Sequence, residues 1–206
     1  MINQASTHPR LKTHFIDLLR KALESLDWNY VTLSRVQYFH GKKPPEFVKK
    51  EHWLERPFAY EFYHQLRCLW RAGGFDSDCV IHAEVYKKYQ AIKDLDKMPD
   101  FLFHLPEPNR NVAVVEVKLA ANDGLQNDLN KLTVFQEILH YEYLVEIVIG
   151  TDAELEDVDL ILKIWARESE RIGHVKHIDV FYVSVDTKKV WHRRTIYSHS
   201  ALRSSG

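Results

Sequence analysis

The spacing of hydrophobic positions changes along the chain and predicts which segments are helices. Apolar residues recur every three or four positions in four segments, at 11–22, 46–72, 123–141 and 153–172. This period matches one face of an α-helix packed on a core. Pro57, inside the second segment, predicts either a kink or the first turn of a new helix, because proline cannot donate to the preceding turn.

Strands are predicted where apolar residues alternate or run together. Residues 99–105 and 111–119 form two such segments, and the turn at 106–110 between them predicts a hairpin. Residues 143–150 are almost continuously apolar, as in a strand buried on both faces. Further extended segments are predicted at 31–39, 80–89, 178–184 and 190–197. The order of elements predicts a mixed α/β domain with helices packed against a central sheet.

Composition and charge narrow the class of protein. A length of 206 residues predicts a single domain over 1–206. With 45% hydrophobic and 28% charged residues, the chain is neither disordered nor fibrous. A formal charge of -1 argues against binding of polyanions through bulk charge, although it leaves a local basic groove open. The spacing of Cys68 and Cys79 fits neither a metal site nor a disulfide framework, and residues 1–14 lack the apolar run of a signal peptide, so a cytoplasmic location is expected.

Charged residues interrupt the hairpin at three positions. Asp100 opens one strand, while Glu116 and Lys118 lie in the next and share a face because strand side chains alternate. Pairing of the two strands would bring Asp100 beside Glu116. Two carboxylates in an apolar sheet repel each other unless a cation joins them, and Mg2+ prefers such oxygen ligands. The alternative is that Glu116 and Lys118 are only the polar face of a half-exposed strand, although residues 112–117 are otherwise apolar.

The motif Pro99-Asp100, followed after fifteen residues by Glu116-Val117-Lys118, resembles the PD-(D/E)XK nuclease superfamily when it is taken with the order of elements. The resemblance covers about residues 55–150. It implies a restriction-endonuclease-like αβββαβ core, with an extra N-terminal helix and a C-terminal helix and strands outside it. It also implies Mg2+ or Mn2+ bound by Asp100, Glu116 and the carbonyl of Val117, with Lys118 acting in phosphodiester hydrolysis.

Other positions match features that recur in this superfamily or lie near the motif. The helix before the core often supplies an acidic residue, for which Glu61 is the candidate; the alternative is a surface glutamate paired with Arg or Lys. Asp128 falls within the apolar arc of the next helix, where it is either part of the site or a salt bridge, with Lys131 one turn away. Glu84 and His104 are open in role: either could adjoin the site or be an ordinary strand residue.

Two functions of different kind follow from these residues. The first is a metal-dependent nuclease acting on nucleic acid, DNA by resemblance, in a defence or repair system, as a homodimer or with a partner subunit that supplies sequence recognition. The second is a non-catalytic binding or scaffolding subunit that keeps the nuclease fold. A third, hydrolysis of a small phosphorylated molecule, would require a closed pocket in place of a groove.

Overall fold

The computed structural model describes residues 9–33, 52–74, 79–83, 99–105, 111–172 and 177–194. The chain divides into two units, Met1–Ser77 and Asp78–Gly206, each of which is described by itself. The nuclease-like core expected over 55–150 crosses this division, so its extent, like the single domain over 1–206, stays a prediction.

The first unit consists mainly of helices. Helix α3 (Glu55–Leu69), which a π-helical turn (Trp70–Gly74) extends, packs against α1 (Pro9–Glu24) and α2 (Trp28–Val31). A two-residue antiparallel ladder joins β1 (Thr32–Leu33) to β2 (His52–Trp53). The apolar stripes of the two long helices supply much of the core of the first unit, including the fully buried Phe15, Leu19, Phe58, Phe62 and Leu66.

The start of α3 corrects the predicted helix at 46–72. The helix begins only at Glu55, and β2 occupies part of the predicted range. Pro57 lies in the first helical turn, which is one of its two predicted positions, because the missing N–H needs no partner there. Leu54, within the predicted helix, is instead the extended N-cap residue and is 43% exposed.

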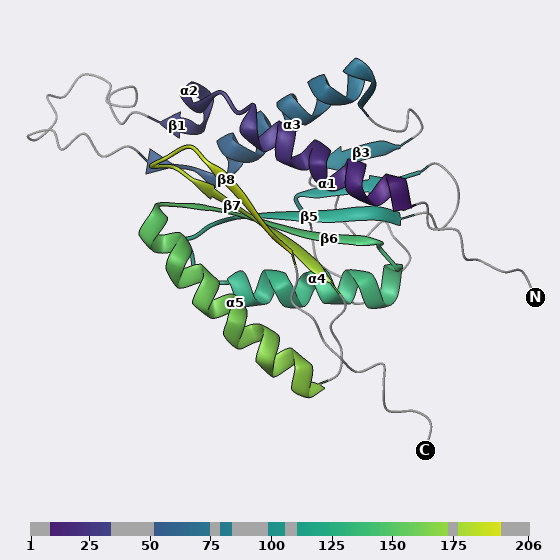
Figure 1. Ribbon diagram of the computed structural model, residues 1–206, viewed down its shortest axis with the longest axis vertical. Helices are drawn as coiled ribbons and strands as arrows, with labels where there is room; N and C mark the ends of the chain where they lie inside the picture. The colour runs from purple at the N-terminus through teal and green to yellow at the C-terminus, as the bar shows by residue number, and fades with distance from the viewer. Residues whose placement is uncertain are drawn as a thin grey trace, which may run out of the picture. The chain divides into compact units, whose positions relative to one another are not determined.

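The second unit contains a six-stranded mixed sheet whose strands follow their order in the chain, β3-β4-β5-β6-β7-β8 (Figure 1). Strands β4 and β5 are antiparallel, so the predicted hairpin is confirmed. The predicted strand β6 belongs to the same sheet and pairs with β5 in parallel. Residues 84–89 and 195–197, predicted to extend two of the strands, lie outside the described residues. The strands are β3 (Val80–Ala83), β4 (Phe101–His104), β5 (Asn111–Leu119), β6 (Tyr143–Gly150), β7 (Ile178–Ser184) and β8 (Val190–Arg194).

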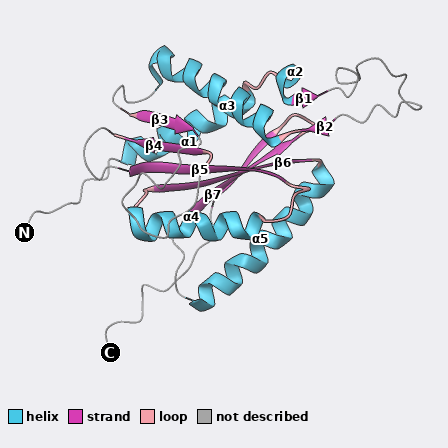
Figure 2. Ribbon diagram, turned by 180° about the vertical axis from the view of Figure 1, so that it is seen from behind, coloured by secondary structure: helices cyan, strands magenta, loops and turns pink. Residues whose placement is uncertain are grey.

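Helices α4 (Leu125–Leu139) and α5 (Asp152–Ile172) lie along one face of this sheet (Figure 2). Their apolar residues form one core with every second residue of the central strands, including Val114, Leu144 and Val148. The alternate strand residues are buried too, which explains the nearly continuous apolar runs of β5 to β7. No helix among the described residues has the length and apolar character needed to cross a membrane.

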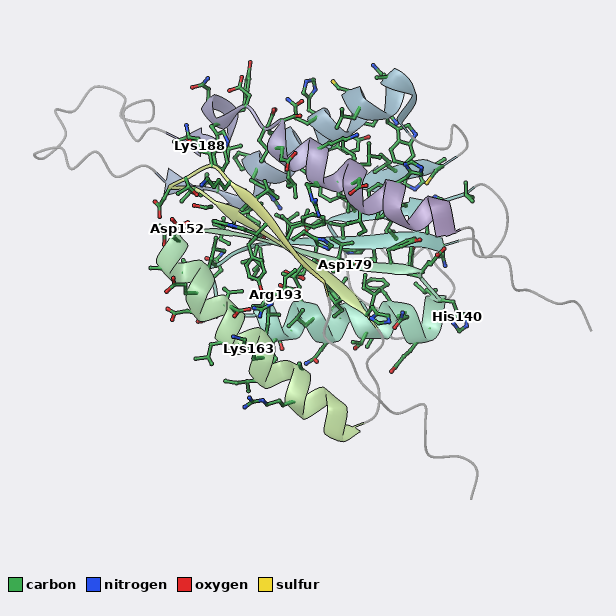
Figure 3. All side chains as sticks on the ribbon, viewed as in Figure 1. His140, Asp152, Lys163, Asp179, Lys188 and Arg193 are labelled. Atoms are coloured by element: carbon green, nitrogen blue, oxygen red, sulfur yellow. The ribbon has the colours of Figure 1, made fainter. Side chains whose placement is uncertain are left out.

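An ion pair links α5 to the edge of the sheet. Arg193 of β8 contacts Asp159 of α5, which also pairs with Lys163 one turn further along the helix (Figure 3). The side chain of Lys163 is 55% exposed. Such exposed pairs contribute little to stability, at most about 1 kcal/mol.

Candidate active site and metal centre

The carboxylate of Asp100 lies where the ladder between β4 and β5 ends. The last backbone pair on this side joins Phe101 to Val115, and Asp100 Oδ2 accepts a hydrogen bond from the N–H of Val117 at 2.7 Å. The carboxylate thus satisfies an N–H that a longer β4 would have bonded. Because the N–H and C=O of a strand residue point toward the same neighbouring strand, the carbonyl of Val117 also faces the β4 side.

Glu116 is on the sheet face that α4 covers, and it is 3% exposed. Its Oε2 accepts a hydrogen bond from Lys131 Nζ at 2.7 Å, whereas its Oε1 is buried with no hydrogen-bond partner among the described residues. Burial raises the pKa of Glu116 to about 8 although Lys131 lowers it, and Asp100 and Asp128 add to the increase. Because the charge of Asp100 raises the pKa of Glu116, the two predicted ligands lie close enough to interact electrostatically.

Lys118 shares this face two residues further along β5. Its Nζ is 3.1 Å from Asp128 Oδ2, and both side chains are 18% exposed. The turn that precedes α4 adjoins the ammonium group: Gly124 has a φ of 107°, and a Cβ there would be 3.5 Å from Lys118 Nζ. Lys118 also lines a pocket of about 300 Å3, which is bounded by the turn and by Val148, Val158 and Ile161.

Asp128 and Lys131 of α4 connect the two charged residues of β5. Lys131 Nζ is 3.4 Å from Asp128 Oδ1, so the one-turn ion pair expected from the sequence is present. Asp128 also pairs with Lys118, so its salt bridge and its place beside the predicted site are compatible. Burial alone would lower the pKa of Lys131, but the carboxylates of Glu116, Asp128 and Asp100 together outweigh it, so the pKa is raised.

Glu146 of β6 is a charged residue that the sequence analysis did not single out. It is completely buried, its Cα pairs with that of Glu116 in the parallel register, and neither carboxylate oxygen has a hydrogen-bond partner among the described residues. Burial raises its pKa well above the usual value, and the nearby Glu116 adds to this increase. A signal for it exists in the sequence, because Glu146 interrupts an apolar run just as Glu116 does.

Glu61, the remaining candidate, belongs to α3 of the first unit. It is buried, and its Oε1 accepts hydrogen bonds from the backbone N–H of Asp27 at 3.0 Å and from Gln65 Nε2 at 2.7 Å. The alternative of a surface glutamate paired with Arg or Lys is therefore wrong, while a role in the site stays a prediction. The ring centroid of His104 is 4.6 Å from that of His82, and Glu84 lies outside the described residues.

These neighbours interact through their charges. Within the described residues, they comprise four carboxylates and two ammonium groups. We call these groups the charge network: Asp100, Glu116, Lys118, Asp128, Lys131 and Glu146.

The donor atoms of the charge network fit a divalent cation. No group of three or more His, Cys, Asp or Glu side chains in the described part of the chain is arranged to hold a metal ion unaided. Mg2+, however, binds through one or two carboxylates and keeps several waters. Asp100, the unpartnered Oε1 of Glu116 and the carbonyl of Val117 supply such a set.

Comparisons with known proteins add no assignment. No protein-family model, no curated protein and no solved structure matched this chain. The functional conclusion therefore depends on the residues and their geometry.

Proposed function

We propose that this chain is a metal-dependent phosphodiester hydrolase, a nuclease that acts on nucleic acid with DNA as the substrate. One observation carries the proposal: Asp100, Glu116 and Lys118 lie at one end of the β4–β5 hairpin, where Oε1 of Glu116 is buried and has no hydrogen-bond partner among the described residues. An ordinary half-exposed strand would leave Glu116 and Lys118 in solvent, where neither charge needs a neighbour. Here both are enclosed by further charges.

The arrangement of elements supports a restriction-endonuclease-like core. In chain order α3, β3, β4, β5, α4 and β6 follow the αβββαβ pattern, and β6 lies parallel to β5 as such a core requires. We propose this fold for the segment around 55–150. The remaining elements would then be additions to the core: α1, α2, β1, β2, α5, β7 and β8.

Each residue has a proposed role. Asp100, Glu116 and the carbonyl of Val117 would hold Mg2+ or Mn2+, which when bound supplies Lewis acidity and lowers the pKa of water. Lys118 would donate to a phosphate oxygen and stabilise the negative charge that develops there. Asp128 holds the ammonium group of Lys118 in place. Glu61 is proposed as an outer acidic residue.

The cellular setting is proposed from the resemblance. We propose that a second copy or a partner subunit supplies sequence recognition. We propose action in a defence or repair system, with a cytoplasmic location.

One feature favours the alternative of a non-catalytic binding or scaffolding subunit. Glu116 is nearly inaccessible, and Lys118 and Lys131 are already engaged in ion pairs. A scaffold that retained the fold could keep these pairs for structure alone. The two functions differ in one measurable property, since only the nuclease cleaves what it binds.

The nuclease is tested by incubating the purified full chain with plasmid, linear duplex and single-stranded DNA, and with single-stranded RNA, in Mg2+, Mn2+ or EDTA. We expect cleavage of DNA only with a divalent metal. Lys118→Ala should reduce the rate by on the order of 100-fold or more, because it removes charge stabilisation from the transition state. Its melting temperature should stay near that of the wild type, since Asp128 keeps its contact with Lys131.

Lys163→Ala is the matched control, because Lys163 likewise forms an ion pair with an aspartate but lies on the exposed side of α5. It should cleave at the wild-type rate. Lys118→Gln gives a second variant of similar length in case the alanine variant folds poorly. Full activity in either folded Lys118 variant would contradict the role of Lys118, and binding without cleavage by the wild type would establish the scaffold.

A further inference from the structure

The parallel pairing of β5 with β6 places two buried carboxylates side by side. Glu116 and Glu146 are register partners, and neighbouring strands lie about 4.8 Å apart. Residues directly opposite in a sheet project to the same face, so both carboxylates lie on the α4 side. The pair is therefore enclosed between two central strands and a helix.

Three of the four oxygens of this pair have no hydrogen-bond partner among the described residues. Lys131 engages Oε2 of Glu116, which leaves Oε1 of Glu116 and both oxygens of Glu146. An ionised carboxylate without a partner is costly to bury, so proteins pair such groups with cations. Glu146 is completely buried, so its carboxylate oxygens have no contact with bulk solvent.

Both ammonium groups of the charge network already form ion pairs with carboxylates other than that of Glu146. Lys118 contacts Asp128, and Lys131 lies between Asp128 and Glu116. Asp100 Oδ2 accepts a hydrogen bond from the N–H of Val117. Among the described residues, the oxygens that remain for a cation are concentrated between β5 and β6.

We infer that Glu146 is a ligand of a divalent cation, which it holds together with the unpartnered Oε1 of Glu116 between β5 and β6. The inference rests on the proposed function, because Glu116 is also a proposed ligand of the Asp100–Glu116 cation site. Hard cations such as Mg2+ and Mn2+ accept two carboxylates and complete their coordination with water. One such ion also places positive charge beside two buried carboxylates, Glu116 and Glu146.

The test is direct binding of Mn2+ alone to the metal-free full chain, measured by electron paramagnetic resonance and by the shift in melting temperature. Glu146→Gln removes the charge at nearly constant shape and should weaken Mn2+ binding at least tenfold. Glu146→Leu is the second variant: it removes a buried carboxylate, so it should fold and melt higher in EDTA while losing most of the Mn2+-induced shift.

Glu156→Gln is the matched control, because Glu156 is an exposed glutamate of α5 and should leave Mn2+ affinity unchanged. Asp100→Asn tests the β4 side of the same site. Wild-type affinity in a folded Glu146 variant would overturn the inference, as would a wild-type protein that binds no Mn2+ at millimolar concentration. Binding of Mn2+ that depends on Glu146, in a protein that cuts no nucleic acid, would overturn the nuclease and leave the cation site standing.

Discussion

The carboxyl group of Glu116 makes the stability of the metal-free protein depend on pH. Its pKa is raised to about 8 in the folded chain from an ordinary value of 4.5, mainly by burial. Between these values the folded state binds more protons than the unfolded state, so the free energy of unfolding falls as pH rises. Glu146, whose pKa is also raised, acts in the same direction.

We therefore expect the metal-free protein to lose stability between pH 5 and pH 8. Each pKa unit corresponds to about 1.4 kcal/mol, so the loss should reach a few kcal/mol. Chemical denaturation in EDTA at several pH values measures it. Glu116→Gln should flatten the slope in part, and Glu116→Gln with Glu146→Gln should flatten it further; an unchanged slope in the double variant would assign the pH dependence to other groups.

Single residues also show where prediction from sequence stops. Asp100, Glu116 and Lys118 were found because charges interrupt apolar strands, and Glu146 gave the same signal within its strand. The bonds of Glu61 could not be found in this way, because its partner Asp27 lies 34 residues earlier and no periodicity relates the two. Tertiary contacts of this kind depend on how separate helices pack.

At the scale of elements, the ends of the parallel strands are held together by close backbone contacts. The N–H of Ala120 donates to the carbonyl of Ile149 at 2.7 Å, and the N–H of Val185 donates to that of Gly150 at 2.9 Å. A Cβ at Gly150 would lie 2.6 Å from the Cβ of Ala120, which is closer than real side chains approach. Gly150 therefore allows β6 to pass the turn after β5.

Gly150→Ala should destabilise the fold by about 1–3 kcal/mol, the usual cost of overpacking. Ala120→Gly removes the opposing methyl group, so Gly150→Ala should cost clearly less in that background. Guanidinium unfolding of the four proteins in this double-mutant cycle measures the coupling. Equal costs in both backgrounds would place the strain elsewhere, for example at Glu154, whose Oε2 lies 3.0 Å from the same Cβ position.

Long elements with a strong period were predictable, as were the short strands β1, β3 and β4, whereas α2 and β2 were not. Strand β7 matches its predicted bounds, and α4 and β6 lie within or at theirs, because their apolar residues face a core. The four residues of α2 are too few to show a helical period, and the ladder of β1 with β2 consists of two pairs. Contacts across the chain, which local spacing does not record, create these short elements.

At the scale of the whole molecule, the described parts of the charge network lie entirely in the second unit. Glu116 and Lys118 belong to β5, Glu146 belongs to β6 and Asp100 precedes β4, whereas α4 supplies Asp128 and Lys131. The hairpin of β4 and β5 was expected from the sequence, whereas the place of β6 beside β5 was not. Glu116 and Glu146 are neighbours because of the parallel register of β5 and β6, and no local sequence pattern specifies that register.

That register has a consequence for the rate of folding. Parallel strands cannot be joined by a tight turn, so Glu116 and Glu146 become neighbours only when the crossover through α4 closes. Closing it brings two charges of the same sign together at high pH and two neutral groups at low pH. In EDTA, stopped-flow refolding should therefore be slower at pH 8 than at pH 5, and Glu146→Gln should remove much of the difference. If the pH dependence appeared only in the unfolding rate, the two strands would meet after the rate-limiting barrier.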